Sequence, residues 1–191
     1  YLVLSLSLSR SEQKLFLYDI KSKKQVEISN QVANFSGQNF DKNDENYFFT
    51  TNYDSEFYYL MSYNLKNGER SIVYKTDWDV TFSYLSKNDS YRVIAVNEDA
   101  QNKLTITNTS EQSNIDLFGF ENMNINSVGF SEDEKFLRVS AGSTNSPGDI
   151  YTYELSTNKL NKITSNLNSK VNPKDLVNAE VIRYESFDGL E

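Results

Sequence analysis

The residue types that carry hydrolytic chemistry are incomplete in this sequence. It contains no histidine and no cysteine, so neither a serine–histidine–aspartate triad nor a cysteine–histidine pair can be assembled from it. It also lacks a Gly-x-Ser-x-Gly motif, which places a nucleophilic serine on a strained strand-to-helix turn. We therefore predict no catalytic residue in this chain.

One acidic loop has the composition of a calcium site. Residues 41–46 (DKNDEN) offer several oxygen ligands, but they lack the glycine at the sixth position and the bidentate glutamate further on. Similar segments at 86–91 and 131–136 have the composition of ordinary turns. We interpret 41–46 as a solvated hairpin, and we expect no metal and no cofactor.

Other charged residues could contact a substrate. The acidic segments 54–56 and 97–99 lie in equivalent loops, where a carboxylate could hold the amino terminus of a peptide. Arg92 and Arg138 fall on equivalent strands, from which a channel or an interdomain face could be reached. The simpler interpretation is a charged loop for the carboxylates and surface ion pairing for the arginines. The substrate-binding residues therefore stay unassigned. The five arginines are Arg10, Arg70, Arg92, Arg138 and Arg183.

Composition excludes several partners. The net charge of −8 argues against nucleic acid, because phosphate binding needs a basic surface. The longest apolar run is about five residues (57–61), so we expect no membrane span. We expect a soluble protein, of bacterial source. Absence of cysteine leaves the cytoplasm, the periplasm and secretion all open.

A repeat sets the positions of all these residues. Similar hexapeptides start at residues 15 (LFLYDI), 60 (LMSYNL), 105 (TITNTS, the weakest copy) and 150 (IYTYEL), a constant period of 45 residues. A period of about 40–50 residues made of short strands is typical of a β-propeller with one four-stranded blade per repeat. We therefore predict an all-β fold of four-stranded antiparallel blades.

The other strands keep the same period. Apolar residues recur in every copy on the second strand of the blade, at Leu4, Phe49, Ile94 and Val139. The turn after the first strand carries Asp, Asn or Ser in each copy (41–43, 86–88 and 131–133), as tight turns require. This agreement predicts a partial blade at 1–30 that lacks its inner strand, followed by complete blades at 33–76, 78–119 and 123–165.

Two arrangements of these blades are possible. A closed four-bladed ring would need residues 170–175 as the missing inner strand, but this segment is polar and contains Pro173, which a central strand avoids. We therefore prefer a partial, roughly four-bladed arc of a larger propeller. Residues 166–179 are rich in Ser, Asn and Lys, which indicates a linker.

The last twelve residues (180–191) resemble a known family. Residues 181–187 (VIRYESF) have strand composition, Asp188-Gly189 indicates a hairpin, and residues 190–191 would open the return strand. A propeller followed by this junction resembles the prolyl oligopeptidase family of serine peptidases, with the acylaminoacyl-peptidase-like and dipeptidyl-peptidase-like branches most similar. The turn at 130–133 (FSED) and the strand at 151–155 (YTYEL) resemble that family and the TolB-type propellers.

This resemblance implies a function for the whole polypeptide. The chain would be the non-catalytic propeller of a serine peptidase that hydrolyses peptides. It would gate substrate access and dock on an α/β-hydrolase domain of the same polypeptide, and 180–191 would be the first strand and hairpin of that domain. No catalytic residue of the family has a matching position here. The alternative is a TolB-like or scaffold propeller that acts as a protein–protein interaction module.

Overall fold

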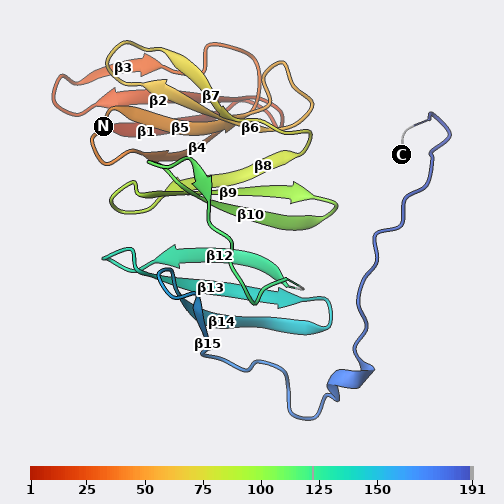
Figure 1. Cartoon of the computed structure of the whole chain (residues 1–191). Helices are drawn as coiled ribbons and strands as arrows, with labels where there is room; N and C mark the ends of the chain where they lie inside the picture. Colours follow the sequence, from red (N-terminus) through yellow and green to blue (C-terminus); the bar gives the residue numbers. More distant parts are fainter. Residues whose placement is uncertain (122, 190–191) are drawn as a thin grey trace. The chain divides into compact units, whose positions relative to one another are not determined.

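The computed structural model describes residues 1–121 and 123–189. Within these residues the strands form four antiparallel sheets, one of three strands and three of four (Figure 1). In the described part of 1–165 the chain has no α-helix. The prediction of an all-β fold made of four-stranded antiparallel propeller blades is therefore confirmed.

Each sheet follows the order of its strands along the chain. The first sheet holds β1 (Leu2–Ser7), β2 (Gln13–Asp19) and β3 (Lys24–Glu27). The second holds β4 (Phe35–Phe40), β5 (Asn46–Thr51), β6 (Tyr59–Asn64) and β7 (Arg70–Tyr74). The third holds β8 (Asp79–Leu85), β9 (Tyr91–Glu98), β10 (Gln101–Asn108) and β11 (Ser113–Asn114). The fourth holds β12 (Asn124–Phe130), β13 (Phe136–Ser143), β14 (Ser146–Glu154) and β15 (Lys159–Lys162).

The chain divides into two compact units. Unit 1 comprises residues 1–116 and 130–134, and unit 2 comprises residues 117–129 and 135–191. Unit 1 contains the first three sheets, and most of the fourth sheet belongs to unit 2. No helix in the described residues is long and apolar enough to cross a membrane.

Apolar faces hold the sheets of unit 1 together. The first and second sheets share a core that includes Leu15, Leu17 and Phe49, and Phe49 is fully buried. The second and third sheets share a core that includes Phe48 and Ile94. Neighbouring residues on β5 point to opposite faces, so Phe48 and Phe49 enter different cores. Strand β5 is therefore buried on both faces, which explains why residues 47–49 are all apolar.

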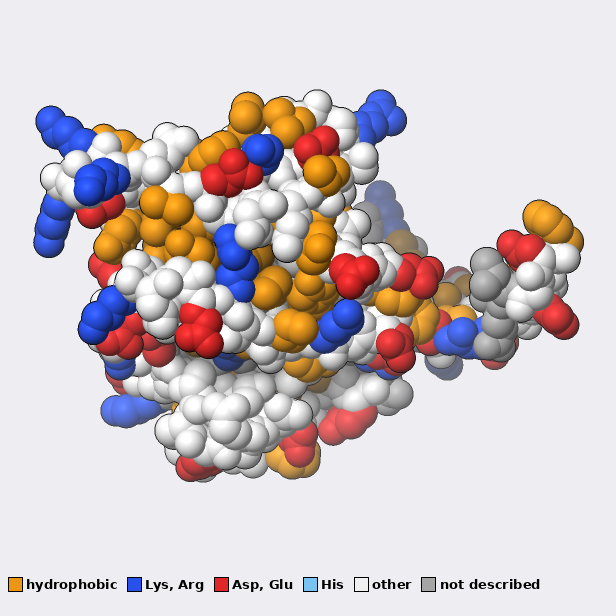
Figure 2. All heavy atoms as spheres, turned by 90° about the horizontal axis from the view of Figure 1, so that it is seen from above, with side chains coloured by type: hydrophobic (Ala, Val, Ile, Leu, Met, Phe, Trp, Pro, Cys, Tyr) orange, Lys and Arg blue, Asp and Glu red, His pale blue; other side chains and the backbone are white. Residues whose placement is uncertain are grey.

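The outer face of the first sheet differs from its counterparts. Leu4 is 46% exposed, whereas Phe49 and Ile94, at the same repeat position, are 0% and 5% exposed. The reason is that Phe49 and Ile94 each face the preceding sheet of unit 1. Figure 2 shows the surface of the first two sheets, where apolar side chains lie between charged ones.

Acidic turn residues connect neighbouring turns within unit 1. Asp89 and Glu134 occupy the same repeat position, and both have left-handed backbone (φ 60° and 56°). The Asp89 carboxylate accepts the Lys42 N–H at 2.8 Å, and the Glu134 carboxylate accepts the Asn88 N–H at 2.5 Å. We call this contact the turn clamp: an acidic residue of one turn accepts a backbone N–H from the turn 45 residues earlier. A carboxylate acceptor makes these bonds stronger than neutral ones.

Inside unit 2, a buried carboxylate fastens the end of the fourth sheet. Asp149 is 2% exposed, and its carboxylate binds the Lys162 ammonium at 2.6 Å, the Thr164 hydroxyl at 3.0 Å and the Asn166 N–H at 2.9 Å. The hydrogen bond from Lys162 lowers the pKa of Asp149. These contacts attach the start of segment 166–179 to β14.

The segment after the fourth sheet forms no strand in the described residues. Pro173–Asp175 makes one 3₁₀ turn, η1, so residues 170–175 do not act as the missing inner strand of a closed ring. A turn at the predicted Asp188-Gly189 hairpin is present, with the Gly189 N–H donated to the Ser186 carbonyl at 3.0 Å. A strand needs a partner strand, so the strand expected at 181–187 stays a prediction. The expected return strand at 190–191 lies outside the described residues.

The turn clamp predicts a pH-dependent contribution to stability. Burial raises the pKa of Glu134, but hydrogen bonds from Ser90, the Asn88 N–H and Ser86 outweigh it, so the pKa lies below its usual value. A lowered pKa stabilises the fold above the unfolded-state pKa, and this contribution is lost as pH falls through the folded-state pKa. We expect Glu134→Gln to cost about 1–2 kcal/mol at pH 7. The free energy of unfolding, measured with denaturant from pH 7 to pH 3, should fall less in the variant than in the wild type.

The matched control is Glu132→Gln. Glu132 pairs with Lys87 on an exposed surface, and exposed ion pairs contribute little. We expect its unfolding midpoint to match the wild type. Equal midpoints for both variants at pH 7 would contradict the role of Glu134.

Gly37 on β4 should not tolerate a side chain. A Cβ at this position would collide with the hydroxyl of Tyr47, a residue that is buried and whose pKa burial raises to about 12. We expect Gly37→Ala to cost about 1–3 kcal/mol, as overpacking does. The cost should fall in a Tyr47→Phe background, because that change removes the colliding oxygen. A double-mutant cycle by denaturant unfolding tests this, and equal costs in the two backgrounds would refute it.

Candidate functional site

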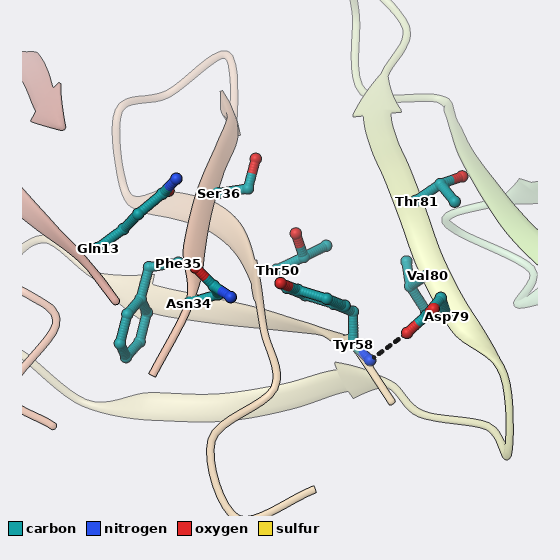
Figure 3. A pocket seen from close by; sticks show the side chains of 9 residues that line it. All are labelled: Gln13, Asn34, Phe35, Ser36, Thr50, Tyr58, Asp79, Val80 and Thr81. Atoms are coloured by element: carbon teal, nitrogen blue, oxygen red, sulfur yellow. Dashed lines mark hydrogen bonds between the residues drawn. The ribbon is translucent and has the colours of Figure 1, made fainter. Parts of the chain in front are cut away.

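A hollow of about 360 Å³ opens in unit 1 where the inner strands β4 and β8 begin (Figure 3). Residues at the same repeat positions of neighbouring sheets line it in pairs: Gln13 and Tyr58, Asn34 and Asp79, Phe35 and Val80, Ser36 and Thr81. Thr50, near the end of β5, completes the lining. The repeat itself therefore builds this hollow.

Backbone hydrogen bonds position the rim of the hollow. The Val80 N–H donates to the Tyr58 carbonyl at 2.9 Å. The Tyr58 N–H donates to Asp79 Oδ1 at 2.9 Å, as Figure 3 shows. These two bonds join the start of the third sheet to the second sheet. In the described part of the chain no donor binds Asp79 Oδ2, so this oxygen is an open acceptor at the rim.

The side chains around the hollow suit hydrogen bonding and not bond cleavage. Asn34 carries an amide, Ser36 and Tyr58 carry hydroxyls, and Asp79 carries a carboxylate. No histidine exists in the sequence to act as a base for a serine. Groups of this kind bind the main-chain amides of an extended peptide or its ammonium group.

The two acidic segments predicted from the sequence do not line this hollow. Residues 54–56 lie in a turn, whereas Asn97 and Glu98 end β9 and only Asp99 lies in the turn that follows. Asp54 and Asp99 have left-handed backbone (φ 50° and 52°), which aspartate tolerates in turns. Glu98 forms an ion pair with Lys103. Burial first, and then the nearby Asp54 carboxylate, raise the pKa of Tyr59. The charged residues Glu98 and Asp54 therefore interact with neighbouring side chains and not with the hollow.

The loop at 41–46 uses its carboxylate oxygens internally. Asp41 Oδ1 accepts the Glu45 N–H at 2.8 Å, and Asp41 Oδ2 accepts the Asn46 side-chain amide at 2.8 Å. Both oxygens of the first candidate ligand are therefore engaged in closing the turn. Among the described residues, no group of three or more acidic side chains could hold a metal ion.

Arg92 is half-buried between the second and third sheets. Its guanidinium carbon is 4.0 Å from the ring centroid of Phe48, and its Nη1 donates to the Ser83 hydroxyl at 3.3 Å. Burial lowers the pKa of Arg92 to about 10. The expected surface ion pair is not what holds Arg92: its guanidinium stacks on Phe48, and the carboxylates of Asp89 and Asp41 act on it only through charge interactions that partly offset the effect of burial on its pKa.

Two other arginines also have local roles. Arg70 donates from Nε and Nη2 to the Ile28 carbonyl at 3.2 and 2.9 Å, which joins the second sheet to the first. Arg138 in unit 2 lies over Gly129, where a Cβ would come within 3.3 Å of its guanidinium. Neither arginine lines the hollow.

Sequence reasoning missed Asn34 and Asp79, although the repeat contains a signal for them. The residue that leads into each inner strand is Asn34, Asp79 and then Asn124, at a constant spacing of 45 residues. A polar residue that recurs immediately before an apolar strand position marks a rim and not a core. The recurrence of this polar residue could have indicated that the start of the inner strands carries a site.

Antiparallel four-stranded sheets at a constant period, joined in chain order, define a β-propeller domain. The family model for the prolyl oligopeptidase N-terminal β-propeller domain matches residues 1–166. The chain therefore belongs to the prolyl oligopeptidase family through this domain.

Solved structures share the fold at low sequence identity. Prolyl oligopeptidase B from Galerina marginata aligns with a TM-score of 0.74 and 14% identity, covering 98% of this chain and 28% of that chain. TolB from Acinetobacter baumannii aligns with a TM-score of 0.62 and 12% identity, covering 85% and 40%. A puromycin-hydrolyzing peptidase from Mycobacterium tuberculosis aligns with a TM-score of 0.60 and 10% identity, covering 84% and 25%.

These likenesses extend over a minor part of each solved chain. This chain spans between 25% and 40% of the length of the three structures named. No curated protein matches the sequence. The shared property is the propeller fold.

Asp79 should control the rim of the hollow. Replacing it by alanine leaves the Tyr58 N–H without its acceptor, whereas asparagine keeps an acceptor oxygen. We expect the Tyr58 amide to exchange about tenfold faster in Asp79→Ala and to change little in Asp79→Asn. Amide hydrogen exchange measures this, with Asp77→Ala as a control on an exposed neighbour. Equal exchange rates in Asp79→Ala and the wild type would contradict the assignment.

Proposed function

We propose that this chain is the propeller portion of a serine peptidase that hydrolyses peptides. It gates access of peptides to a catalytic α/β-hydrolase domain of the same polypeptide, and it docks on that domain. The observation that carries the proposal is the family match, which spans all four sheets and ends at residue 166. A chain without histidine also needs a partner domain for the chemistry.

The segment after residue 166 supports the docking part of the proposal. Asn166 is tied to Asp149, and the Ala179 N–H donates to the Thr144 hydroxyl at 3.0 Å, so both ends of the 166–179 linker are attached to unit 2. The apolar side chains that follow are exposed: Ile182 at 80%, Tyr184 at 78% and Phe187 at 102%. Exposed apolar residues in succession indicate a binding partner, and we assign 180–191 to the first strand and hairpin of the hydrolase domain.

The hollow at the inner strands supports a share in peptide binding. Its amide and hydroxyl groups offer donors and acceptors to a peptide main chain, and Asp79 offers an acceptor for an ammonium group. In this proposal the propeller holds and filters the peptide, and the partner domain cleaves it.

The test uses the whole gene product. Peptides of increasing length are assayed for hydrolysis, and Asp79→Ala is compared with Asp77→Ala. We expect Asp79→Ala to lower kcat/KM by about tenfold, as the loss of a charge-assisted hydrogen bond does, and Asp77→Ala to leave it unchanged. A whole gene product that hydrolyses no peptide would refute the proposal. Equal kcat/KM values for the two variants would show that the hollow takes no part in peptide binding.

A scaffold function is the second candidate. The likeness to TolB from Acinetobacter baumannii favours a propeller that acts as an interaction module. The reading frame after residue 191 separates the two candidates. A hydrolase-type α/β pattern with Gly-x-Ser-x-Gly, then Asp, then His, supports the peptidase, and its absence supports the scaffold.

The chain by itself should be inert as a hydrolase. Its serines have no histidine base, so a fluorophosphonate probe should label none of them. Gel fluorescence and peptide mapping of the labelled 191-residue chain check this. The matched control is the same chain with a known serine hydrolase added, which must label in the same tube. A labelled peptide from this chain would contradict the prediction.

A further inference from the structure

A second pocket in unit 1, of about 170 Å³, lies on the face of the second sheet that packs against the first sheet. Its apolar lining includes Phe35, Phe49, Tyr59 and Met61, and Phe35 also lines the hollow. The three aromatic side chains are buried, and the ring centroids of Phe35 and Phe49 lie 5.9 Å apart. An apolar cavity of about 150 Å³ in another protein takes up benzene, so this pocket has room for one aromatic ring.

Arg70, the first residue of β7, brings a positive charge to this pocket. Its Nε and Nη2 atoms donate to the Ile28 carbonyl, and its guanidinium carbon lies 5.5 Å from the ring centroid of Tyr63. Within the described residues no carboxylate pairs with Arg70, and its Nη1 atom has no acceptor. A fixed, half-buried guanidinium of this kind favours an anionic ligand.

Thr51 adds a hydroxyl to the lining of the same pocket. Thr51 is 0% exposed, and its hydroxyl accepts the Tyr53 N–H at 3.1 Å. In the part of the chain that the structure describes, no acceptor binds the proton of this hydroxyl. The Tyr59 hydroxyl is already used, because it donates to the Tyr53 carbonyl at 2.9 Å. A buried hydroxyl proton needs an acceptor, so Thr51 can donate to a ligand.

The charged residues around Tyr59 leave an excess of positive charge at the pocket. Lys75 Nζ lies 4.9 Å from the ring centroid of Tyr59. The Asp54 carboxylate is the second cause, after burial, that raises the pKa of Tyr59. Lys75 and Asp54 therefore offset each other, and Arg70 supplies the remaining charge.

We propose that this pocket binds a carboxylate that is carried on a single aromatic ring. The ring packs among Phe35, Phe49 and Tyr59, and the carboxylate accepts hydrogen bonds from Arg70 and Thr51. The carboxylate belongs either to a free small acid or to the last residue of a peptide, and the test separates these two sources. This binding does not depend on the proposed peptidase function, because it needs no catalytic domain.

The test titrates phenylacetate into the 191-residue chain and follows the backbone amide signals by NMR. We expect a Kd of about 1 mM, which a ligand of this size reaches at a modest efficiency per atom. The shifted signals should include pocket residues, namely Gln31, Thr51, Tyr53 and Met61. Phenylacetamide has the same shape without the charge, and we expect it to bind at least about tenfold more weakly. Tighter binding of N-acetylphenylalanine than of phenylacetate assigns the site to a peptide terminus, and weaker binding assigns it to a free acid.

Two matched substitutions test the role of charge without disturbing the core. Gln31 lines the pocket and is exposed, and no hydrogen bond holds its side chain in the described residues. We expect Gln31→Glu to weaken phenylacetate binding by about threefold or more, because it adds a negative charge, and to leave phenylacetamide binding unchanged. Gln25→Glu adds the same charge on β3, outside the lining, and its Kd should equal that of the wild type.

The cation itself is tested with Arg70→Gln. We expect this variant to bind phenylacetate at least about tenfold more weakly and to lose the preference over phenylacetamide. Arg70 also joins two sheets, so if this variant fails to fold, the pair Gln31→Glu and Gln25→Glu decides. The proposal is overturned if phenylacetate gives no saturable shift at the pocket residues. Equal binding of phenylacetate and phenylacetamide overturns it too, as does an equal phenylacetate Kd in the two glutamine variants.

Discussion

The burial of apolar sheet faces against the next sheet is the interaction on which the rest of unit 1 depends. A fully buried side chain such as Phe49 or Leu60 contributes about 1.5–3 kcal/mol, and each sheet supplies several of them. A single hydrogen bond contributes about 1 kcal/mol net. Apolar packing therefore holds the sheets together. The weaker polar contacts, such as Arg92 over Phe48 and the turn clamp at Asp89, decide how neighbouring sheets are aligned.

Alignment matters because side chains from all three sheets of unit 1 line the hollow. Asn34 and Asp79 line the same hollow only if the first residues of β4 and β8 lie side by side. The hydrogen bonds of Tyr58 at the rim hold the two strand ends in this arrangement. The residues of this site come from several strands, and no single loop supplies them. Its groups bind and orient, and the sequence holds no base that could turn a hydroxyl into a nucleophile.

The repeat predicted the architecture well and the exposure of individual residues poorly. A period of 45 residues gave the four sheets, because strand order in a propeller follows chain order. Leu4 and Phe49 share a repeat position, yet their exposures differ, because burial depends on whether a neighbouring sheet covers the face. The hollow was not predicted, since the polar residues Asn34 and Asp79 are separately unremarkable in sequence. A surface ion pair was expected for Arg92, because composition does not reveal a stacked ring such as Phe48.

The turn clamp also bears on how such a chain can change its length. Lys42 and Asn88 each donate a turn N–H to the following repeat, where Asp89 and Glu134 accept it, so the repeat at 78–119 carries both halves of the contact. A duplicated repeat would therefore arrive with both halves of the contact already matched to its neighbours. Duplication of this repeat could therefore add a whole blade without a new kind of junction.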